Sequence, residues 1–125
     1  MSAPLSRGRR VDKPWGHELI WAETARYVGK ILHIEKGHAL SLQYHERKEE
    51  TLHVLSGVLE LEFGAPGEPL SKVLLRPGDG FHVRPLLRHR MAAVETCDVV
   101  EASTPELDDV VRLEDRYGRA GTSKA

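Results

Sequence analysis

Short apolar runs separated by glycine and proline occupy the chain between residues 12 and 105. Apolar and charged residues alternate along the segment 58–63, which is typical of a strand with one buried face. The β-rich segment 51–56 comes just before it, and Ser56-Gly57 predicts a tight turn that joins two antiparallel strands. By the same reasoning we expect further strands at residues 17–22, 27–34, 40–45, 71–75, 80–83, 89–94 and 98–103.

Roughly eight or nine short strands with almost no helix predict an all-β domain, built as a sandwich or a barrel. Residues 106–119 depart from this pattern. Acidic residues open that segment, Leu107, Val110 and Val111 follow helical spacing imperfectly, and Gly118 closes it. We therefore expect a short C-terminal helix packed on the barrel.

The two ends of the chain differ from its middle. Residues 1–11 are polar and basic, and we expect them to form a flexible arm. Residues 120–125 are small and polar and should form a disordered tail. The folded domain is then expected to span residues 12–119, helix included.

Composition narrows the classes of function. A chain of 125 residues fits one domain, and 18 Lys and Arg against 19 Asp and Glu give no reason to expect nucleic-acid binding. No apolar run approaches the ~20 residues that a membrane span needs. The single cysteine, Cys97, excludes an internal disulfide, which fits a reducing compartment. We expect a cytoplasmic protein without membrane or nucleic-acid partners.

Candidate metal ligands concentrate in one stretch of the sequence. Gln43 and His45 point to the same face of their predicted strand, and Glu50 can fold back beside them at the start of the next. His89 comes from a third segment. Each residue alone is more often structural or solvated, but together they form a mixed nitrogen and oxygen site for a divalent first-row metal. Zinc is our first expectation, and manganese, iron, nickel and cobalt also suit these ligands.

These residues also occupy the positions of a known motif. Gly37, His45, Glu50 and Gly57 fall where the first motif of the cupin family places its glycine, second histidine, glutamate and final glycine. Gln43 stands in place of the usual first histidine. The chain thus resembles the cupins, and the resemblance implies a double-stranded β-helix, or jelly-roll barrel, with metal ligands on adjacent strands.

Three segments resemble one branch of this family, the cupin domain of type II mannose-6-phosphate isomerases. They are the stretch 40–45, the Lys13-Pro14-Trp15-Gly16 motif and the ending at 108–119, and the similarity covers about residues 11–119. In that branch the domain is often fused to a guanylyltransferase domain, which this sequence lacks, so nucleotide-sugar synthesis is not supported.

The second cupin motif departs from the family pattern. It normally ends in Ile-Pro-Pro-Gly-Thr-x-His, whereas this chain keeps only Pro85 and His89 and has Leu86 in place of the glycine. A leucine would be strained in a turn that needs a positive φ, so the loop before His89 is expected to change. Either the loop adopts another turn, or the pocket recognises a different ligand.

The resemblance implies a metal-dependent isomerase that interconverts aldose and ketose sugar phosphates. Gln43, His45, Glu50 and His89 would bind the metal, Arg112 and Arg119 would bind the phosphate, and no residue stands out as the general base. The alternative for both arginines is a solvated helix end. The alternatives for the protein are a cupin of another activity, such as a dioxygenase, and a non-catalytic module that binds a sugar or metabolite. At family level we also expect a homodimer in which strands pair across subunits.

Overall fold

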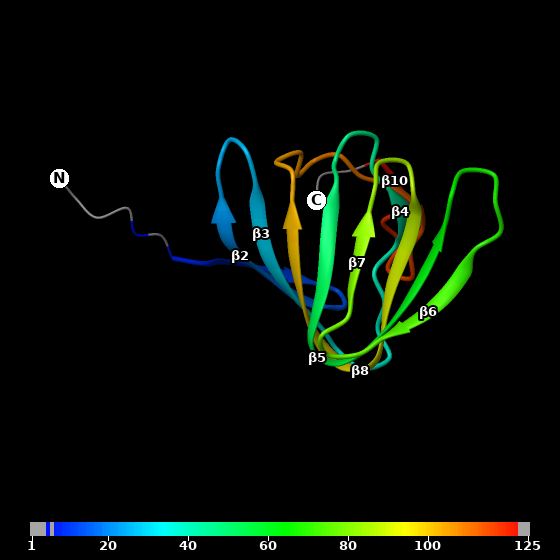
Figure 1. Cartoon of the computed structure of the whole chain (residues 1–125), viewed down its shortest axis with the longest axis horizontal. Coiled ribbons are helices and arrows are strands. Elements are labelled where there is room, and N and C mark those ends of the chain that lie inside the picture. The colour runs from blue at the N-terminus through cyan, green and yellow to red at the C-terminus, as the bar shows by residue number, and fades with distance from the viewer. Residues whose placement is uncertain (1–4, 6, 123–125) are drawn as a thin grey trace.

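A computed structural model describes residue 5 and residues 7–122 (Figure 1). These residues contain strands and no helix. The strands are β1 Arg9–Lys13, β2 Gly16–Glu23, β3 Val28–Ile34, β4 Leu42–Tyr44, β5 Glu50–Gly64, β6 Ser71–Leu75, β7 Gly80–Val83, β8 Arg88–Ser103, β9 Val111–Glu114 and β10 Gly121–Thr122. Within this part of the chain, no helix is long and apolar enough to cross a membrane.

All strand pairs are antiparallel, and the sheet follows the order β1-β2-β3-β8-β4-β9-β10. Strand β5 lies beside β8 and also pairs with β6 and β7. Figure 1 shows that the sheet curls, with β2 and β3 at one side and β6 at the other. The fold is therefore all-β, as the strand pattern predicted, and agrees with the jelly-roll barrel that the resemblance implied.

The predicted turn at Ser56-Gly57 is wrong, because β5 runs on through these residues. Its register with β8 shifts between Val54 and Leu59, which bends both long strands. Gly57 has a φ of 82°, and a Cβ there would lie 2.1 Å from the carbonyl oxygen of Thr96. The glycine therefore marks a bend with close backbone contact, and β8 likewise joins the two strands expected at 89–94 and 98–103.

Alternation along β5 fills the interior, as predicted for the segment 58–63, where Leu59 and Leu61 are buried. Leu52 and Val54 are buried while Thr51 and His53 are exposed. The apolar core also contains Trp15, Leu32, Ile34, Leu40, Leu59, Leu61, Leu75, Val83, Met91, Ala93, Cys97 and Val99. The same interior holds charged side chains, which are Glu18, Lys30, Lys48, Glu50, Glu101 and Arg112.

The expected C-terminal helix is also wrong. Short turns occupy residues 105–110, and β9 follows, pairing with β4 so that Arg112 lies opposite Gln43. Adjacent Val110 and Val111 are β-branched, and the hydrogen bonds offered by β4 outweigh the weak helical spacing of this segment.

The chain ends carry more strand than expected. Strand β1 begins at Arg9, inside the segment expected as an arm, because residues 9–13 pair with residues 16–20 of β2. Strand β10 lies inside the expected tail and pairs with β9. The rest of both predictions, at residues 1–4, 6 and 123–125, lies outside the described residues.

Candidate metal centre and adjoining cavity

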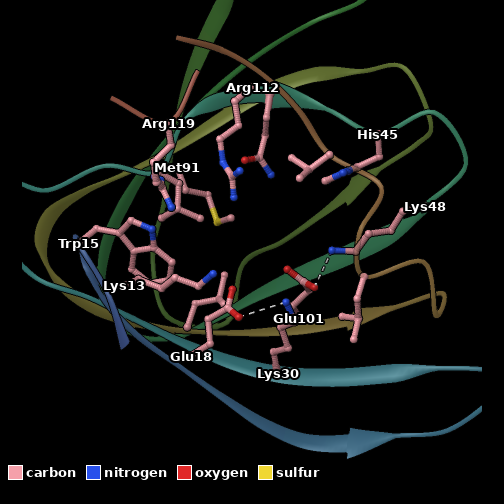
Figure 2. Close-up of a pocket in the computed structure, with 15 residues that line it drawn as sticks. Lys13, Trp15, Glu18, Lys30, His45, Lys48, Met91, Glu101, Arg112 and Arg119 are labelled. Carbon is pink, nitrogen blue, oxygen red and sulfur yellow. Dashed lines mark hydrogen bonds and ion pairs between the residues drawn. The ribbon is translucent and has the colours of Figure 1, made fainter. Parts of the chain in front are cut away.

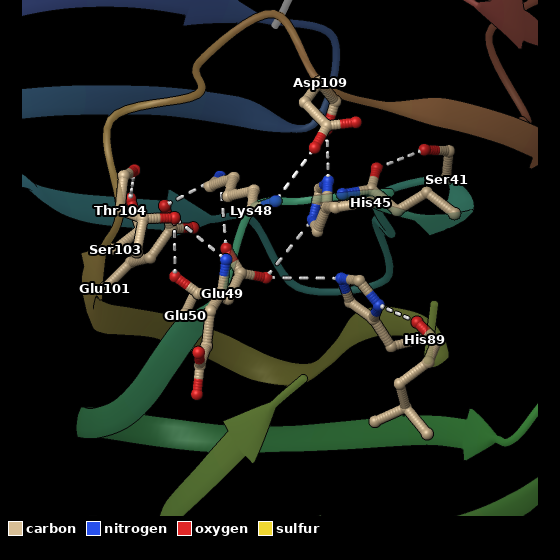
Figure 3. A network of polar contacts seen from close by, with 12 residues as sticks. Ser41, His45, Lys48, Glu49, Glu50, His89, Glu101, Ser103, Thr104 and Asp109 are labelled. Carbon is tan, nitrogen blue, oxygen red and sulfur yellow. Dashed lines mark hydrogen bonds and ion pairs between the residues drawn. The ribbon is translucent and has the colours of Figure 1, made fainter. Parts of the chain in front are cut away.

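Three predicted metal ligands meet inside the barrel (Figure 3). His45 follows β4, Glu50 begins β5 and His89 lies on β8, the strand that pairs with both. One ligand atom from each residue lies within 4.8 Å of the others. The Glu50 Oε1 atom is 3.6 Å from His45 Nε2 and 3.3 Å from His89 Nε2. All three side chains are buried, so the donors face one another away from bulk water.

The hydrogen bonds of both imidazoles leave Nε2 available for a metal. His45 Nδ1 lies 2.6 Å from the carbonyl oxygen of Asp109, and His89 Nδ1 lies 2.9 Å from that of Leu87. A carbonyl oxygen only accepts, so each Nδ1 carries a proton, and the Nε2 atoms are the ring nitrogens that face inward. Neither Nε2 atom has a hydrogen-bond partner in the described part of the chain. Two such nitrogens facing a carboxylate fit a divalent cation, and backbone carbonyls commonly orient metal-binding histidines in this way.

Glu50 keeps its negative charge despite its burial. Burial alone would raise its pKa, but the ammonium group of Lys48 holds that pKa well below its usual range. Lys48 Nζ lies 3.2 Å from Glu50 Oε2 and 3.2 Å from Glu101 Oε2. Burial would lower the pKa of Lys48, but these two carboxylates raise it instead. The ion pair therefore supplies the site with an ionised oxygen ligand.

Asp109 fixes the loop that carries His45. Its carboxylate accepts hydrogen bonds from the backbone N–H groups of Glu46, Arg47 and Lys48 at 3.0, 2.6 and 2.8 Å. Burial would raise the pKa of Asp109, but these three donors lower it. The same residue therefore holds His45 through its carbonyl and the next turn through its side chain. The sequence reasoning missed this role, since Asp109 lies 64 positions from His45.

Gln43 lies on β4 directly opposite His89 of β8 and Arg112 of β9. Directly opposite residues share a face of the sheet, so Gln43 stands between the metal-binding donors and the arginine. Its Oε1 accepts a hydrogen bond from the Ser41 hydroxyl at 2.6 Å. Gln43 lines the same cavity as His45, and its direct contact with a metal stays a prediction.

A cavity opens beside His45, one of the three donors (Figure 2). His45 and Lys48 lie at one side of it, and Trp15, Lys13 and Arg119 lie at the other. Its charged lining consists of the cations Lys13, Lys30, Lys48, Arg112 and Arg119 and the carboxylates Glu18 and Glu101. This excess of positive charge favours an anionic ligand.

Both predicted phosphate-binding arginines line this cavity, although neither stands on a helix. Arg112 is buried on β9, where burial and the nearby Arg119 lower its pKa. Arg119 forms two hydrogen bonds with the Asp115 carboxylate, at 2.9 and 3.0 Å. Sequence reasoning assigned no role to Lys13, which belongs to the Lys13-Pro14-Trp15-Gly16 motif and also lines the cavity.

The loop before His89 keeps a left-handed residue at the position of the family's glycine. Leu86 has a φ of 72° and is the one non-glycine residue with a positive φ in the described part of the chain. Its N–H donates a hydrogen bond of 2.7 Å to the His45 carbonyl oxygen. This contact joins the segments that carry the two histidines. The strained backbone conformation of Leu86 is therefore found where it helps to hold the metal donors together.

Comparisons with known proteins agree with this fold and site. The chain is 30% identical over 116 residues to the xanthan biosynthesis protein XanB of Xanthomonas campestris pv. campestris, covering 89% of this chain and 24% of XanB. It is 30% identical over 113 residues to mannose-1-phosphate guanylyltransferase ManC of Salmonella typhimurium, covering 89% and 23%. The chain thus spans about a quarter of the length of these relatives.

The structure of KdgF from Halomonas sp. has a TM-score of 0.68 to this one, with 26% sequence identity, and the match covers 78% of this chain and 88% of KdgF. Residues 30–102 match the family described as the cupin domain, and they include all four predicted metal ligands. The protein belongs to the cupin family.

Proposed function

We propose that the protein is a metal-dependent isomerase that interconverts aldose and ketose forms of a phosphorylated sugar, as mannose-6-phosphate isomerases do. One observation carries the proposal: three metal donors converge next to a cavity that His45, one of the three, lines together with a group of cations. His89 and Arg112 flank Gln43 on neighbouring strands, so about 10 Å separates their backbones. A small sugar phosphate would fit between the two groups.

The two ends of the cavity would have different tasks, metal binding at one and phosphate binding at the other. His45, Glu50, His89 and Gln43 would hold the metal, and zinc suits this mixture of nitrogen and oxygen ligands best. A bound divalent ion supplies Lewis acidity that polarises the substrate carbonyl. Arg112 and Arg119 would hold the phosphate, because guanidinium groups match phosphate oxygens in pairs. A carboxylate is a suitable proton carrier, and Glu18 and Glu101 are the carboxylates that line the cavity.

The names of the two relatives support a sugar-phosphate substrate. ManC is named for its action on mannose 1-phosphate, and XanB for xanthan biosynthesis. These names describe proteins about four times as long as the region matched, so the substrate remains our proposal.

The test is conversion of mannose 6-phosphate to fructose 6-phosphate by protein loaded in turn with each candidate metal. We expect turnover that His89→Ala abolishes and that Arg112→Gln reduces mainly through a higher KM. Sugar-phosphate binding without turnover would indicate a binding module instead. Oxygen consumption by the iron-loaded protein, with indifference to sugar phosphates, would indicate a dioxygenase.

We further propose that the protein is a cytoplasmic homodimer. Strand β1 is the end of the described sheet and pairs only with β2, which leaves an edge for a second subunit. Buried Cys97 is a free thiol whose pKa burial raises to about 11, as suits a structural cysteine in a reducing compartment. Light scattering should give the mass of a dimer for the full chain and of a monomer after deletion of residues 1–11. A monomer in both cases would contradict the homodimer.

A further inference from the structure

Lys13 is held firmly at the far side of the cavity. It is the last residue of β1 and pairs with Gly16 of β2 across the turn at residues 14–15. A Cβ on Gly16 would lie 1.9 Å from the His33 carbonyl oxygen, so this turn is pressed against β3. The neighbouring Trp15 is buried, and its carbonyl oxygen accepts the N–H of Glu35 at 3.0 Å. The backbone of Lys13 is therefore fixed, and Figure 2 shows its amine directed into the cavity.

The charge of Lys13 has no close counter-ion among the described residues. Among the other cations of the cavity, Lys30 pairs with Glu18 at 3.2 Å, Lys48 with Glu101 at 3.2 Å, and Arg119 with Asp115 at 2.9 Å. The ammonium group of Lys13 makes no hydrogen bond or ion pair with any residue between 7 and 122, or with residue 5. Glu18 attracts it, but that carboxylate already holds Lys30.

Its surroundings disfavour the charged amine. Burial lowers the pKa of Lys13, Glu18 opposes this shift, and Lys30, Arg112 and Arg119 lower the pKa further. An anion placed among these cations would reverse the effect, because it supplies the missing opposite charge. Anion binding near Lys13 should therefore be accompanied by uptake of a proton at alkaline pH.

We propose that Lys13 is a direct ligand of the substrate's phosphate group and that it completes, with Arg112 and Arg119, a three-cation phosphate site opposite the metal donors. This inference rests on the proposed function in taking the cavity's anion to be a phosphate. The flexible ammonium group provides hydrogen-bond donors where the rigid guanidinium groups cannot adjust. Lys13 thus acts in substrate selection, favouring phosphorylated over neutral sugars.

Titration calorimetry with inorganic phosphate tests the proposal. At alkaline pH, where a lysine with a lowered pKa loses its proton before an ordinary lysine does, the wild-type protein should take up protons on binding. Comparing buffers of different ionisation enthalpy detects this uptake. Lys13→Met should weaken phosphate binding by about tenfold or more and abolish the proton uptake. Lys13→Arg should bind phosphate without proton uptake, which also shows that the fold survives a change at this position.

Lys36→Met is the matched control, since Lys36 pairs with Glu95 at 3.6 Å and its side chain is 65% exposed. It should behave as the wild type. Unchanged phosphate affinity or persistent proton uptake in Lys13→Met would overturn the proposal, as would a wild-type protein that does not bind phosphate. Lys13-dependent phosphate binding without isomerase turnover would reject the proposed reaction alone. Turnover with Lys13-independent phosphate binding would reject the role of Lys13 alone.

Discussion

Leu86 occupies a backbone conformation that suits glycine better than leucine. Its φ of 72° costs a leucine about 1–2 kcal/mol, and its side chain is half exposed, so it gains little from burial. Glycine would remove this strain but would gain more freedom in the unfolded chain. We expect Leu86→Gly to raise the free energy of unfolding by about 0.5–1 kcal/mol, measured by urea denaturation.

Leu87→Gly provides the control for this prediction. Leu87 has no positive φ and packs against the core, so its replacement should destabilise the protein. A loss of stability in Leu86→Gly as well would show that the side chain of Leu86, and not its backbone strain, decides the effect.

Single residues of the site were predictable where a local rule applied. His45 and Glu50 follow from alternation along strands and from the short connection between them, and the motif added His89. Lys13 and Asp109 were not assignable, because their roles depend on contacts with residues far away in the sequence. No spacing rule relates Asp109 to the backbone amides of residues 46–48, which it binds across the barrel.

Among the elements, errors arose where tertiary pairing overrides a local signal. Strand β9 replaces the expected helix because β4 offers it hydrogen bonds, and the helical spacing there was imperfect. Gly57 looked like a turn residue, yet it bends β5 because β8 passes close to its Cα. The strands at 71–75 and 80–83 were predicted with their observed bounds, since loops rich in glycine and proline limit both.

The loop between β4 and β5 depends on Asp109. In Asp109→Ala three backbone N–H groups lose their acceptor, and the turn after His45 should loosen. We expect the free energy of unfolding to fall by about 1–2 kcal/mol and the metal affinity to fall about 10-fold to 100-fold. Denaturant unfolding and competition with a chelator measure these effects. Asp108 is exposed, so Asp108→Ala should change neither quantity. Equal effects of the two substitutions would contradict the proposed role of the Asp109 carboxylate in holding this loop.

Strand β3 carries a histidine that couples stability to pH. His33 Nδ1 lies 2.7 Å from Asp98 and Nε2 lies 3.1 Å from Glu35, while His17 of β2 stacks on its ring at 4.9 Å. The hydrogen bond with Asp98 is the main cause that raises the pKa of His33 above its ordinary value, although burial opposes the shift. The protonated form is therefore favoured in the folded state.

A raised pKa stabilises the fold below the unfolded pKa of His33, and this contribution is lost as pH rises through the folded pKa. The side chain is 26% exposed, so we expect less than about 1 kcal/mol. His33→Gln should flatten the decline in unfolding free energy as pH rises above the ordinary histidine pKa of about 6.5. Parallel pH profiles of wild type and variant would contradict this assignment.

At the scale of the whole molecule, the interior of the barrel holds both an apolar core and a charged cavity. Its apolar part holds Trp15, Leu52 and their neighbours, whereas Glu18 and Lys30 form an ion pair whose side chains are 11% and 3% exposed. Buried ion pairs are often neutral or unfavourable for stability relative to apolar residues. The charges are therefore better explained by the cavity they line than by stability, and stability should depend on what the site binds.

Metal binding is the clearest case. His45, Glu50 and His89 come from segments that only folding brings together, so a metal that binds them stabilises the folded state selectively. At a free metal concentration of 100 times Kd the gain is about 2.7 kcal/mol, which raises Tm by roughly 10 °C in a domain of this size. We expect a chelator to lower Tm by this amount and zinc to restore it, as followed by thermal unfolding.

Substitutions distinguish residues that bind the metal from residues that do not. His89→Ala should abolish the response of Tm to metal, and Gln43→Ala should reduce it if the amide belongs to the site as predicted. Lys36→Met, outside the cavity, should respond as the wild type does. Suppose that neither chelator nor zinc changes Tm, in protein shown to contain no metal. The two imidazoles and Glu50 would then pair with one another without a metal ion. Neither Nε2 atom has a hydrogen-bond partner within the part of the chain that the structure describes, and buried polar atoms are rarely left without one, so we expect a cation between the two imidazoles and Glu50.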